Sequence, residues 1–202
     1  METGFIGKAS SNYAKKTVVI FGSPRGGTTL IAGLTKILGI DIGSDLPRNL
    51  EDPNFAKRSV VEIKNSIKAR NQANSVWGWK FPNAINYLDD IRQELINPHY
   101  VCVFRDPIAI ATKWAIANKR PPHTAAWEAL SLMQKNMYFC ASSGDPYCFI
   151  SYERSVEDPL QTTVFLSTFL EIKEKIDETL VSQFAKRSST AQGGYKNSDL
   201  IR

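Results

Sequence analysis

Short apolar runs alternate with amphipathic segments along most of the chain. Four runs are almost wholly apolar and rich in β-branched or aromatic residues, as is typical of strands buried on both faces of a sheet: 17–21, 76–81, 100–104 and 147–152. Between them apolar side chains recur three and four residues apart, which predicts helices at 30–38, 60–67, 85–95, 108–118, 124–141, 160–170 and 172–185. Residues 41–56 are rich in Asp, Pro, Asn and Gly and predict a long surface loop.

This alternation predicts an α/β fold in which parallel strands are joined by helical crossovers. Helices then cover both faces, which gives a three-layer α/β/α architecture around a central parallel sheet. The chain has 202 residues, of which 43% are hydrophobic, enough for one core and thin for two. We therefore expect one domain over residues 1–202, with an ordered core at about 15–186 and a polar tail at 187–202.

Composition narrows the classes of function. The formal net charge of +5 favours anionic ligands, but the basic residues are too dispersed to favour nucleic acid as a partner. The three cysteines, Cys102, Cys140 and Cys148, form no CxxC pair and are expected to be reduced and structural. Because the chain has neither an apolar leader nor an 18-residue apolar window, we expect a cytoplasmic protein without a transmembrane segment. No oligomeric state is indicated.

Charged residues follow the predicted strands. Ligands of open parallel sheets bind beyond the carboxyl ends of the strands, so the residues just after each strand are the first candidates for a site. Arg25 lies in the loop after the first strand, Lys80 ends the second, and Arg105 follows the third. Tyr152-Glu153-Arg154 follows the fourth. Three or four cations are therefore expected at one edge of the sheet, which predicts a polyanionic ligand.

The first of these segments, Gly22-Ser23-Pro24-Arg25-Gly26-Gly27-Thr28-Thr29, has the frame of a phosphate-binding loop. Thr28, however, stands where the lysine of G-x-x-x-x-G-K-[ST] belongs. Glycines let consecutive backbone N–H groups point at one anion, and the following helix adds its positive end. The Arg25 guanidinium suits a bidentate grip on a tetrahedral oxyanion. The loop predicts a phosphate-like ligand held without a metal, and a turn that merely requires glycine is the alternative.

These residues resemble the sulfotransferases that use 3′-phosphoadenosine 5′-phosphosulfate (PAPS). Residues 24–29 are similar to their P-[KR]-[SG]-G-T-T loop, which holds the 5′-phosphosulfate. Arg105-Asp106-Pro107 resembles the R-[DN]-P element that contacts the 3′-phosphate, although Lys113, with Thr112 beside it, replaces the family's serine. Gly78-Trp79-Lys80-Phe81-Pro82 is similar to the G-x-K-x-P element of bacterial and carbohydrate sulfotransferases. Residues 150–154, followed by Asp158-Pro159, resemble their Y-E-x-L segment, and residues 193–197 resemble a late glycine-rich stretch.

The resemblance implies a P-loop-like fold and transfer of a sulfuryl group from PAPS to a hydroxyl, with a carbohydrate as the preferred acceptor. Adenosine 3′,5′-bisphosphate would be the product, and no metal is expected. The implied nucleotide-binding residues are Ser23, Pro24, Arg25, Gly26, Gly27, Thr28, Thr29, Arg105, Thr112 and Lys113. Lys80 would reach the bridging or sulfuryl oxygens.

A general base is also needed, because a hydroxyl is a poor nucleophile until its proton is removed. Glu51 is the first candidate, because bacterial relatives have an acidic residue after the first helix, and His123 is the second. Asp52, Glu62 and His99 stay open, although His99 precedes a strand and is expected at the far edge of the sheet.

Two other classes of function remain. A Mg²⁺-dependent kinase or other nucleotide hydrolase has the same loop architecture, but Thr28 in the lysine's place and Arg105 ahead of Asp106 count against it. A non-catalytic nucleotide-binding module would keep the pocket and lack a base.

Overall fold

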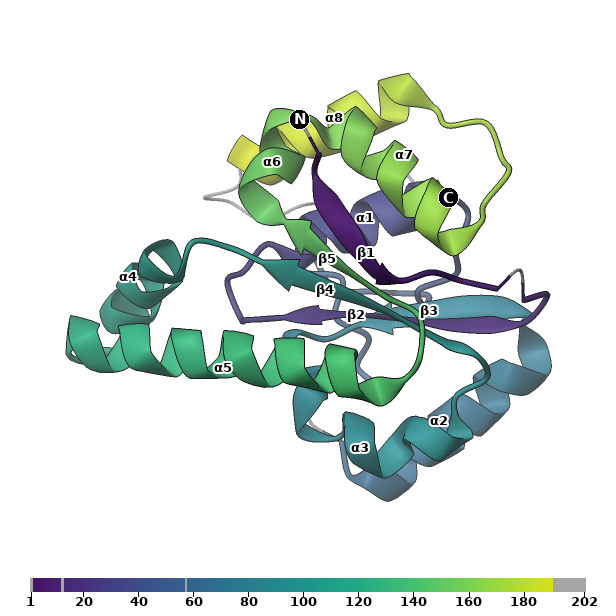
Figure 1. The fold of residues 1–202 in the computed structure, drawn as a ribbon, viewed down its shortest axis with the longest axis horizontal. Helices are drawn as coiled ribbons and strands as arrows, with labels where there is room; N and C mark the ends of the chain where they lie inside the picture. The colour runs from purple at the N-terminus through teal and green to yellow at the C-terminus, as the bar shows by residue number, and fades with distance from the viewer. Residues whose placement is uncertain (1, 12, 57, 191–202) are drawn as a thin grey trace.

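A computed structural model describes residues 2–11, 13–56 and 58–190 of the chain. Its centre is a five-stranded sheet in the order β1-β5-β4-β2-β3, with helices on both faces (Figure 1). The strands are β1 (Gly4–Lys8), β2 (Lys16–Gly22), β3 (Val76–Lys80), β4 (Pro98–Phe104) and β5 (Tyr147–Ser151). Strands β2 to β5 pair in parallel and β1 pairs antiparallel with β5. The predicted α/β architecture is confirmed, and one domain over residues 1–202 stays a prediction.

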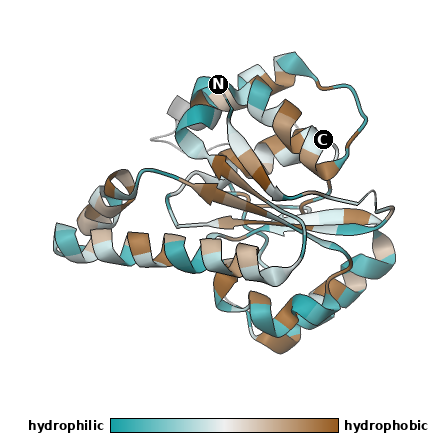
Figure 2. Ribbon diagram, in the orientation of Figure 1, coloured by the Kyte–Doolittle hydropathy of each residue, from teal (hydrophilic) through white to brown (hydrophobic). Residues whose placement is uncertain are grey.

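The central strands are buried because neighbours and helices cover them on every side. All seven residues of β2 are buried between β3 and β4, and β4 and β5 are hydrophobic along most of their length (Figure 2). Successive side chains of a strand point to opposite faces of the sheet. Val18 and Ile20 therefore contribute to one core and Val19 and Phe21 to the other.

The two cores define the helical layers. One face is covered by α1 (Thr28–Ile37), α6 (Tyr152–Glu157), α7 (Pro159–Leu170) and α8 (Glu178–Thr190). The opposite face carries α2 (Val60–Ala73), η1 (Pro82–Asn86), α3 (Leu88–Ile91), η2 (Arg92–Glu94) and α5 (Pro122–Ser143). Helix α4 (Pro107–Asn118) and the start of α5 extend beyond the carboxyl ends of the strands (Figure 1).

Strand β1 is absent from the sequence prediction. Its sequence, GFIGK, contains no buried apolar run, because four of its five residues are exposed at the sheet edge. Its glycines permit a close approach to β5. A Cβ on Gly4 would lie 2.2 Å from the Phe149 carbonyl oxygen, and one on Gly7 would lie 2.0 Å from the Tyr147 ring. The structured region therefore begins ahead of the expected residue 15.

Two helix predictions are also corrected. Residues 85–95 do not form one amphipathic helix but the end of η1, the short α3 and η2. The helix expected at 172–185 starts at Glu178, because Glu171 adopts φ +57 and ends α7, and residues 172–177 are not helical. Helix α8 then extends to Thr190, four residues past the expected end of the core. The rest of the predicted tail and the glycine-rich stretch at 193–197 lie outside the described residues.

The three cysteines are buried and unpaired, as the sequence predicts. Burial raises the pKa of the Cys102 and Cys148 thiols well above the usual range, which keeps both groups protonated. No helix within the described ranges has the length and apolar character needed to span a bilayer. A cytoplasmic location stays a prediction.

Candidate functional site

The candidate site lies at the carboxyl edge of the sheet, where β2 ends between β3 and β4. The chain passes from β2 to β3 on one side and then to β4 on the other, which makes the end of β2 a topological switch point. The strand register pairs Ile20 with Lys80 and Gly22 with Val103. Lys80, Arg105 and the 22–27 loop therefore lie at the same edge, as the sequence predicts.

The loop from Gly22 to Gly27 is tight and depends on glycine. The Gly26 N–H donates to the Ser23 carbonyl at 2.8 Å, and a Cβ on Gly26 would lie 2.6 Å from that oxygen. Arg25 has φ +65, and Gly27, with φ +88, is the N-cap of α1. No side chain caps this helix, so the first-turn amides of Thr28 and Thr29 have no intrahelical acceptor. The loop and the helix start therefore form a backbone cradle that suits an anion.

Two polar side-chain atoms at this cradle lack partners. Within the described ranges, Ser23 Oγ and Arg105 Nε are buried without a hydrogen bond. A buried donor without an acceptor costs free energy, and an anion in the cradle would supply acceptors. The residues present therefore fit a phosphate or sulfate group.

The 22–27 loop and the first turn of α6 both hold the Arg105 segment in place. Its Nη1 donates to the Arg25 carbonyl at 2.9 Å, and its guanidinium carbon lies 4.5 Å from the centroid of the Tyr152 ring. Glu153 accepts the Asp106 N–H at 2.9 Å, and the Asp106 carboxylate caps α4. These contacts fix the start of α4 against the anion cradle.

Lys113 completes a cluster of three cations with Arg25 and Arg105. Partial desolvation and the positive charges of Arg105 and Arg25 lower the pKa of its ammonium, because both effects disfavour the charged form of the lysine. Thr112 is exposed, and its hydroxyl donates to the Ile108 carbonyl within α4. Of the two residues at the family's serine position, the structure brings Lys113 to the cluster.

Lys80 and Glu51 form an ion pair beside the cradle. The Lys80 side chain is 2% exposed, and its Nζ lies 2.9 Å from Glu51 Oε1 and 3.1 Å from the Asn49 carbonyl oxygen. Thr29, in the first turn of α1, donates to the same Asn49 oxygen at 3.2 Å. Burial lowers the pKa of the Lys80 ammonium and the Glu51 carboxylate opposes this shift. The structure thus brings together two of the three predicted catalytic residues.

His123 is not brought to these groups. It is exposed at the second position of α5 and has no hydrogen bond or ion pair with the described residues. Its role stays a prediction.

The other acids and bases considered from the sequence have structural partners. Glu62 forms a capping box with Ser59 at the start of α2, and this hydrogen bonding lowers the pKa of its carboxyl group. Asp52 is buried and pairs with Arg70. His99 lies at the amino-terminal end of β4, as expected. Arg154 does not join the cations, because its Nη1 donates to the Glu2 carbonyl at 2.6 Å.

Three contributors to the site are not recognised from the sequence, and a fourth, Tyr152, is marked there only by its place after the fourth strand. Tyr152 lies over Gly27 and Arg105. Trp114 Nε1 donates to the Pro24 carbonyl at 3.1 Å. The Asn49 carbonyl has no side-chain signal, and Arg70 reaches the site only through tertiary contacts.

Residues 2–11, 13–56 and 58–190 contain no group of three or more His, Cys, Asp or Glu side chains placed to hold a metal ion. Metal-independent binding stays a prediction.

Comparison with solved structures places the fold. The chain is similar to the sulfotransferase domain of the curacin biosynthetic pathway, with a TM-score of 0.58 and 16% identity over 82% of this chain and 76% of that one. It is also similar to the sulfotransferase domain of the Synechococcus PCC 7002 olefin synthase, with a TM-score of 0.58 and 15% identity over 96% and 87% of the two chains. An unliganded sugar kinase from Janibacter sp. HTCC2649 matches with a TM-score of 0.51 and 13% identity, over 79% and 96%.

No protein-family model and no curated protein matches the sequence. At these identities the structural matches define the fold alone. The chain therefore has the α/β fold of sulfotransferase domains, which it shares in coarser outline with a sugar kinase.

Proposed function

We propose that the chain is a sulfotransferase that moves a sulfuryl group from PAPS to an acceptor hydroxyl. One observation carries the proposal: Arg105 donates to the Arg25 carbonyl of a glycine loop whose Ser23 hydroxyl is buried without a partner in the described chain, and α4, which carries Lys113, contacts the same loop through Trp114. A cluster of like charges around open backbone amides is suited to a ligand with two anionic groups.

The resemblance divides the nucleotide between these residues. The amides of the loop, the Arg25 guanidinium and the Thr28 hydroxyl bind the 5′-phosphosulfate. The Thr29 hydroxyl already donates to the Asn49 carbonyl, so Thr29 contributes its backbone N–H instead. Arg105 and Lys113 bind the 3′-phosphate, with Lys113 acting in place of the family's serine. The sulfotransferase domains with the same fold support the class of enzyme, and the division of the nucleotide among these residues rests on the resemblance of the motifs.

The transfer needs a base and charge neutralisation. An acceptor oxygen forms a bond to sulfur, the sulfur–oxygen bond to the 5′-phosphate breaks, and the electron pair of that bond stays on adenosine 3′,5′-bisphosphate. Glu51 takes the acceptor proton. Among the described residues Lys80 donates to Glu51 and Asn49, which leaves its third N–H group for a sulfuryl or bridging oxygen. Preorganised donors of this kind contribute about 3 kcal/mol each.

We further propose a carbohydrate hydroxyl as the acceptor. The G-x-K-x-P resemblance at residues 78–82 supports this choice. Loop 41–56 supplies Glu51 and has exposed residues at 44, 45 and 47–49, so this loop would contact the acceptor.

Calorimetry with adenosine 3′,5′-bisphosphate in EDTA tests donor binding. We expect binding without metal and about a hundredfold weaker binding in Arg25→Ala, because a guanidinium that binds phosphate contributes several charge-assisted hydrogen bonds. Arg92→Ala is the matched control. Arg92 pairs with Asp145 at the opposite edge of the sheet, so its loss should leave binding unchanged.

Transfer is measured with radiolabelled PAPS and a panel of nitrophenyl glycosides. Binding of Mg-ATP alone would indicate a kinase or nucleotide hydrolase. Tight binding of the bisphosphate without transfer to any hydroxyl would indicate a binding module. Normal binding and transfer in Arg25→Ala would overturn the assignment of the loop.

A further inference from the structure

Residues 41–52 leave the edge of the sheet and return to it at one place. Asp41 forms a parallel bridge with Trp77, and its carbonyl accepts the Gly78 N–H at 2.8 Å. The loop then extends past the end of β3 and returns at Asp52, which is 3% exposed. Its two ends lie close together, because a Cβ on Gly43 would lie 2.8 Å from Asp52 Oδ2, as in a compact surface loop with a closed neck.

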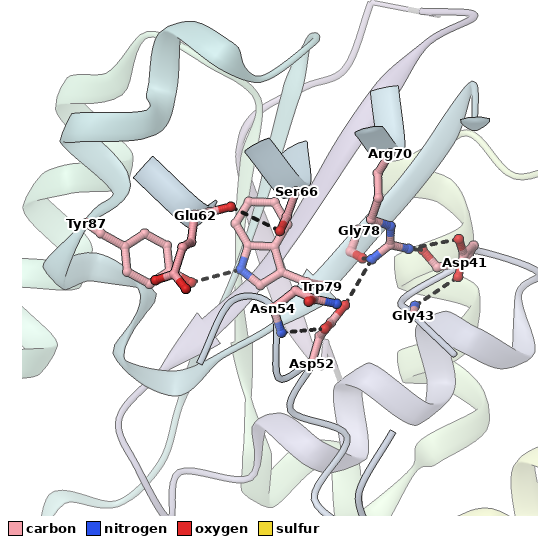
Figure 3. A network of polar contacts seen from close by, with 10 residues as sticks. All are labelled: Asp41, Gly43, Asp52, Asn54, Glu62, Ser66, Arg70, Gly78, Trp79 and Tyr87. Atoms are coloured by element: carbon pink, nitrogen blue, oxygen red, sulfur yellow. Dashed lines mark hydrogen bonds and ion pairs between the residues drawn. The ribbon is translucent and has the colours of Figure 1, made fainter. Parts of the chain in front are cut away.

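Arg70, on α2, binds both sides of this neck (Figure 3). Its Nη2 lies 2.8 Å from Asp41 Oδ2 and donates to the Asp41 carbonyl at 3.0 Å. Its Nη1 donates to Asp52 Oδ2 at 3.3 Å and to the Gly78 carbonyl at 3.0 Å. The guanidinium carbon also lies 4.5 Å from the centroid of the Trp77 ring. A planar fork can make all these contacts together, whereas a lysine ammonium cannot.

The loop closed by Arg70 carries the groups that contact Lys80. Glu51 directly precedes Asp52, and Asn49 lies two residues earlier. Asp52 also begins a rigid turn, because its carboxylate accepts the Asn54 N–H and its carbonyl accepts the amide of Phe55. A shift of Asp52 therefore moves Glu51 relative to Lys80.

We propose that Arg70 is a positioning residue for the Glu51–Lys80 pair, and that it acts by closing the neck of loop 41–52; its effect on catalysis rests on the proposed function. Arg70 does not contact the anion cradle through any of its hydrogen bonds or ion pairs to the described residues. Its loss should therefore slow transfer without weakening the binding of the nucleotide.

The kinetic test compares Arg70→Met, Arg70→Lys, Glu51→Gln and the double variant Arg70→Met/Glu51→Gln. In Arg70→Met we expect kcat to fall at least about tenfold while the Kd for adenosine 3′,5′-bisphosphate changes less than about threefold. Arg70→Lys should not restore kcat. The double variant should be no slower than Glu51→Gln alone, because residues that act through one group are not additive. Additive losses would overturn the proposal.

Arg92→Met is the matched control for losing a paired arginine. Arg92 binds Asp145 and the Ser143 carbonyl, away from loop 41–52. If kcat fell as much in Arg92→Met as in Arg70→Met, general destabilisation would explain both losses, and the proposal would be overturned.

Amide hydrogen exchange tests the same clamp without any catalysis. In Arg70→Met the amides of Gly43, Leu50 and Asn54 should exchange at least about tenfold faster than in the wild type and in Arg92→Met. Unchanged exchange there would contradict the clamp even if the chain binds PAPS. If instead the chain binds no nucleotide but the loop amides respond, the proposed function fails and the clamp stands.

Discussion

Gly27 combines two constraints at the anion cradle. Its φ of +88 is in the left-handed region, and a Cβ there would lie 1.9 Å from the Tyr152 ring. The ring cannot easily move aside, because the Arg105 guanidinium lies 4.5 Å from its centroid. Gly27 therefore sets both the backbone of the loop and the place of Arg105.

We expect Gly27→Ala to destabilise the protein more than an ordinary left-handed glycine substitution does. Gly144→Ala is the control, since Gly144 has φ +75 and nothing within 4 Å of a built Cβ. The control should cost about 1 kcal/mol through backbone strain, and Gly27→Ala more than about 2 kcal/mol because a steric clash is added. Urea unfolding measures both values, and equal values would show that the ring yields freely.

The sequence predicts some residues of the candidate site and not others. The sequence predicts Arg25, Lys80 and Arg105 because each follows or ends an apolar run, and parallel strands end at a common edge. Glu51 required the resemblance, and its pairing with Lys80 is a tertiary contact. Arg70 lies on an amphipathic helix that gives no sign of its four acceptors. Placing such a residue requires knowing how α2 sits beside β3.

At the scale of elements, β1 is the exception in the sheet. It has five residues, is mostly exposed and joins the sheet through one antiparallel neighbour. Phe5 contacts Phe149 edge to face at 5.1 Å between ring centroids, yet is 55% exposed. Strand β2, in contrast, is buried throughout.

We expect β1 to open locally, below the free energy of global unfolding. Its amides should exchange at least about tenfold faster than those of β2, because few apolar contacts hold the strand. Phe5→Ala should speed exchange in β1 and leave β2 unchanged. Native-state hydrogen exchange followed by NMR makes the comparison, and identical opening free energies for both strands would contradict it.

The same contrast explains which elements the sequence reveals. The runs that form β2 to β5 are apolar because they are covered on both faces, so composition alone marks them. Strand β1 is recognisable only once β5 is known to lie beside it. The late start of α8 depends on Glu171, which adopts a left-handed conformation at the end of α7. A glycine at this position would have marked the helix end in the sequence, but a glutamate does not.

For the molecule as a whole, a buried polar chain links its parts at the amino edge of the sheet. His99 is fully buried, and its Nε2 lies 2.8 Å from Ser10 Oγ. Ser10 also donates to Glu171, which pairs with the buried Lys16 at 3.0 Å. The chain ties the segment after β1 to β4 and to the end of α7.

Because of His99, the free energy of unfolding should decrease as the pH is lowered. Burial lowers the pKa of its imidazole from 6.5 to about 4. Above pH 6.5 neither state is protonated at this residue. Between pH 6.5 and 4 the unfolded chain binds a proton that the folded chain does not, so the free energy of unfolding decreases by about 3 kcal/mol as pH falls.

His99→Gln provides the comparison for this prediction. Urea unfolding at pH 7 and pH 4 should show a larger decrease in the wild type than in the variant. Parallel decreases in the two proteins would mean that other groups, such as paired carboxylates, account for the acid sensitivity.

The two edges of the sheet are unequal. On the β3 side, the Asp41 carbonyl accepts the Gly78 N–H and Arg70 donates to the Gly78 carbonyl, so both backbone groups of Gly78 have partners. The β1 side has no further strand within the described residues. A sheet with two open borders could grow without limit, copy upon copy. One with a single open border can meet its like only once, after which the assembly closes, and the contacts of Asp41 and Arg70 with Gly78 occupy part of the second border.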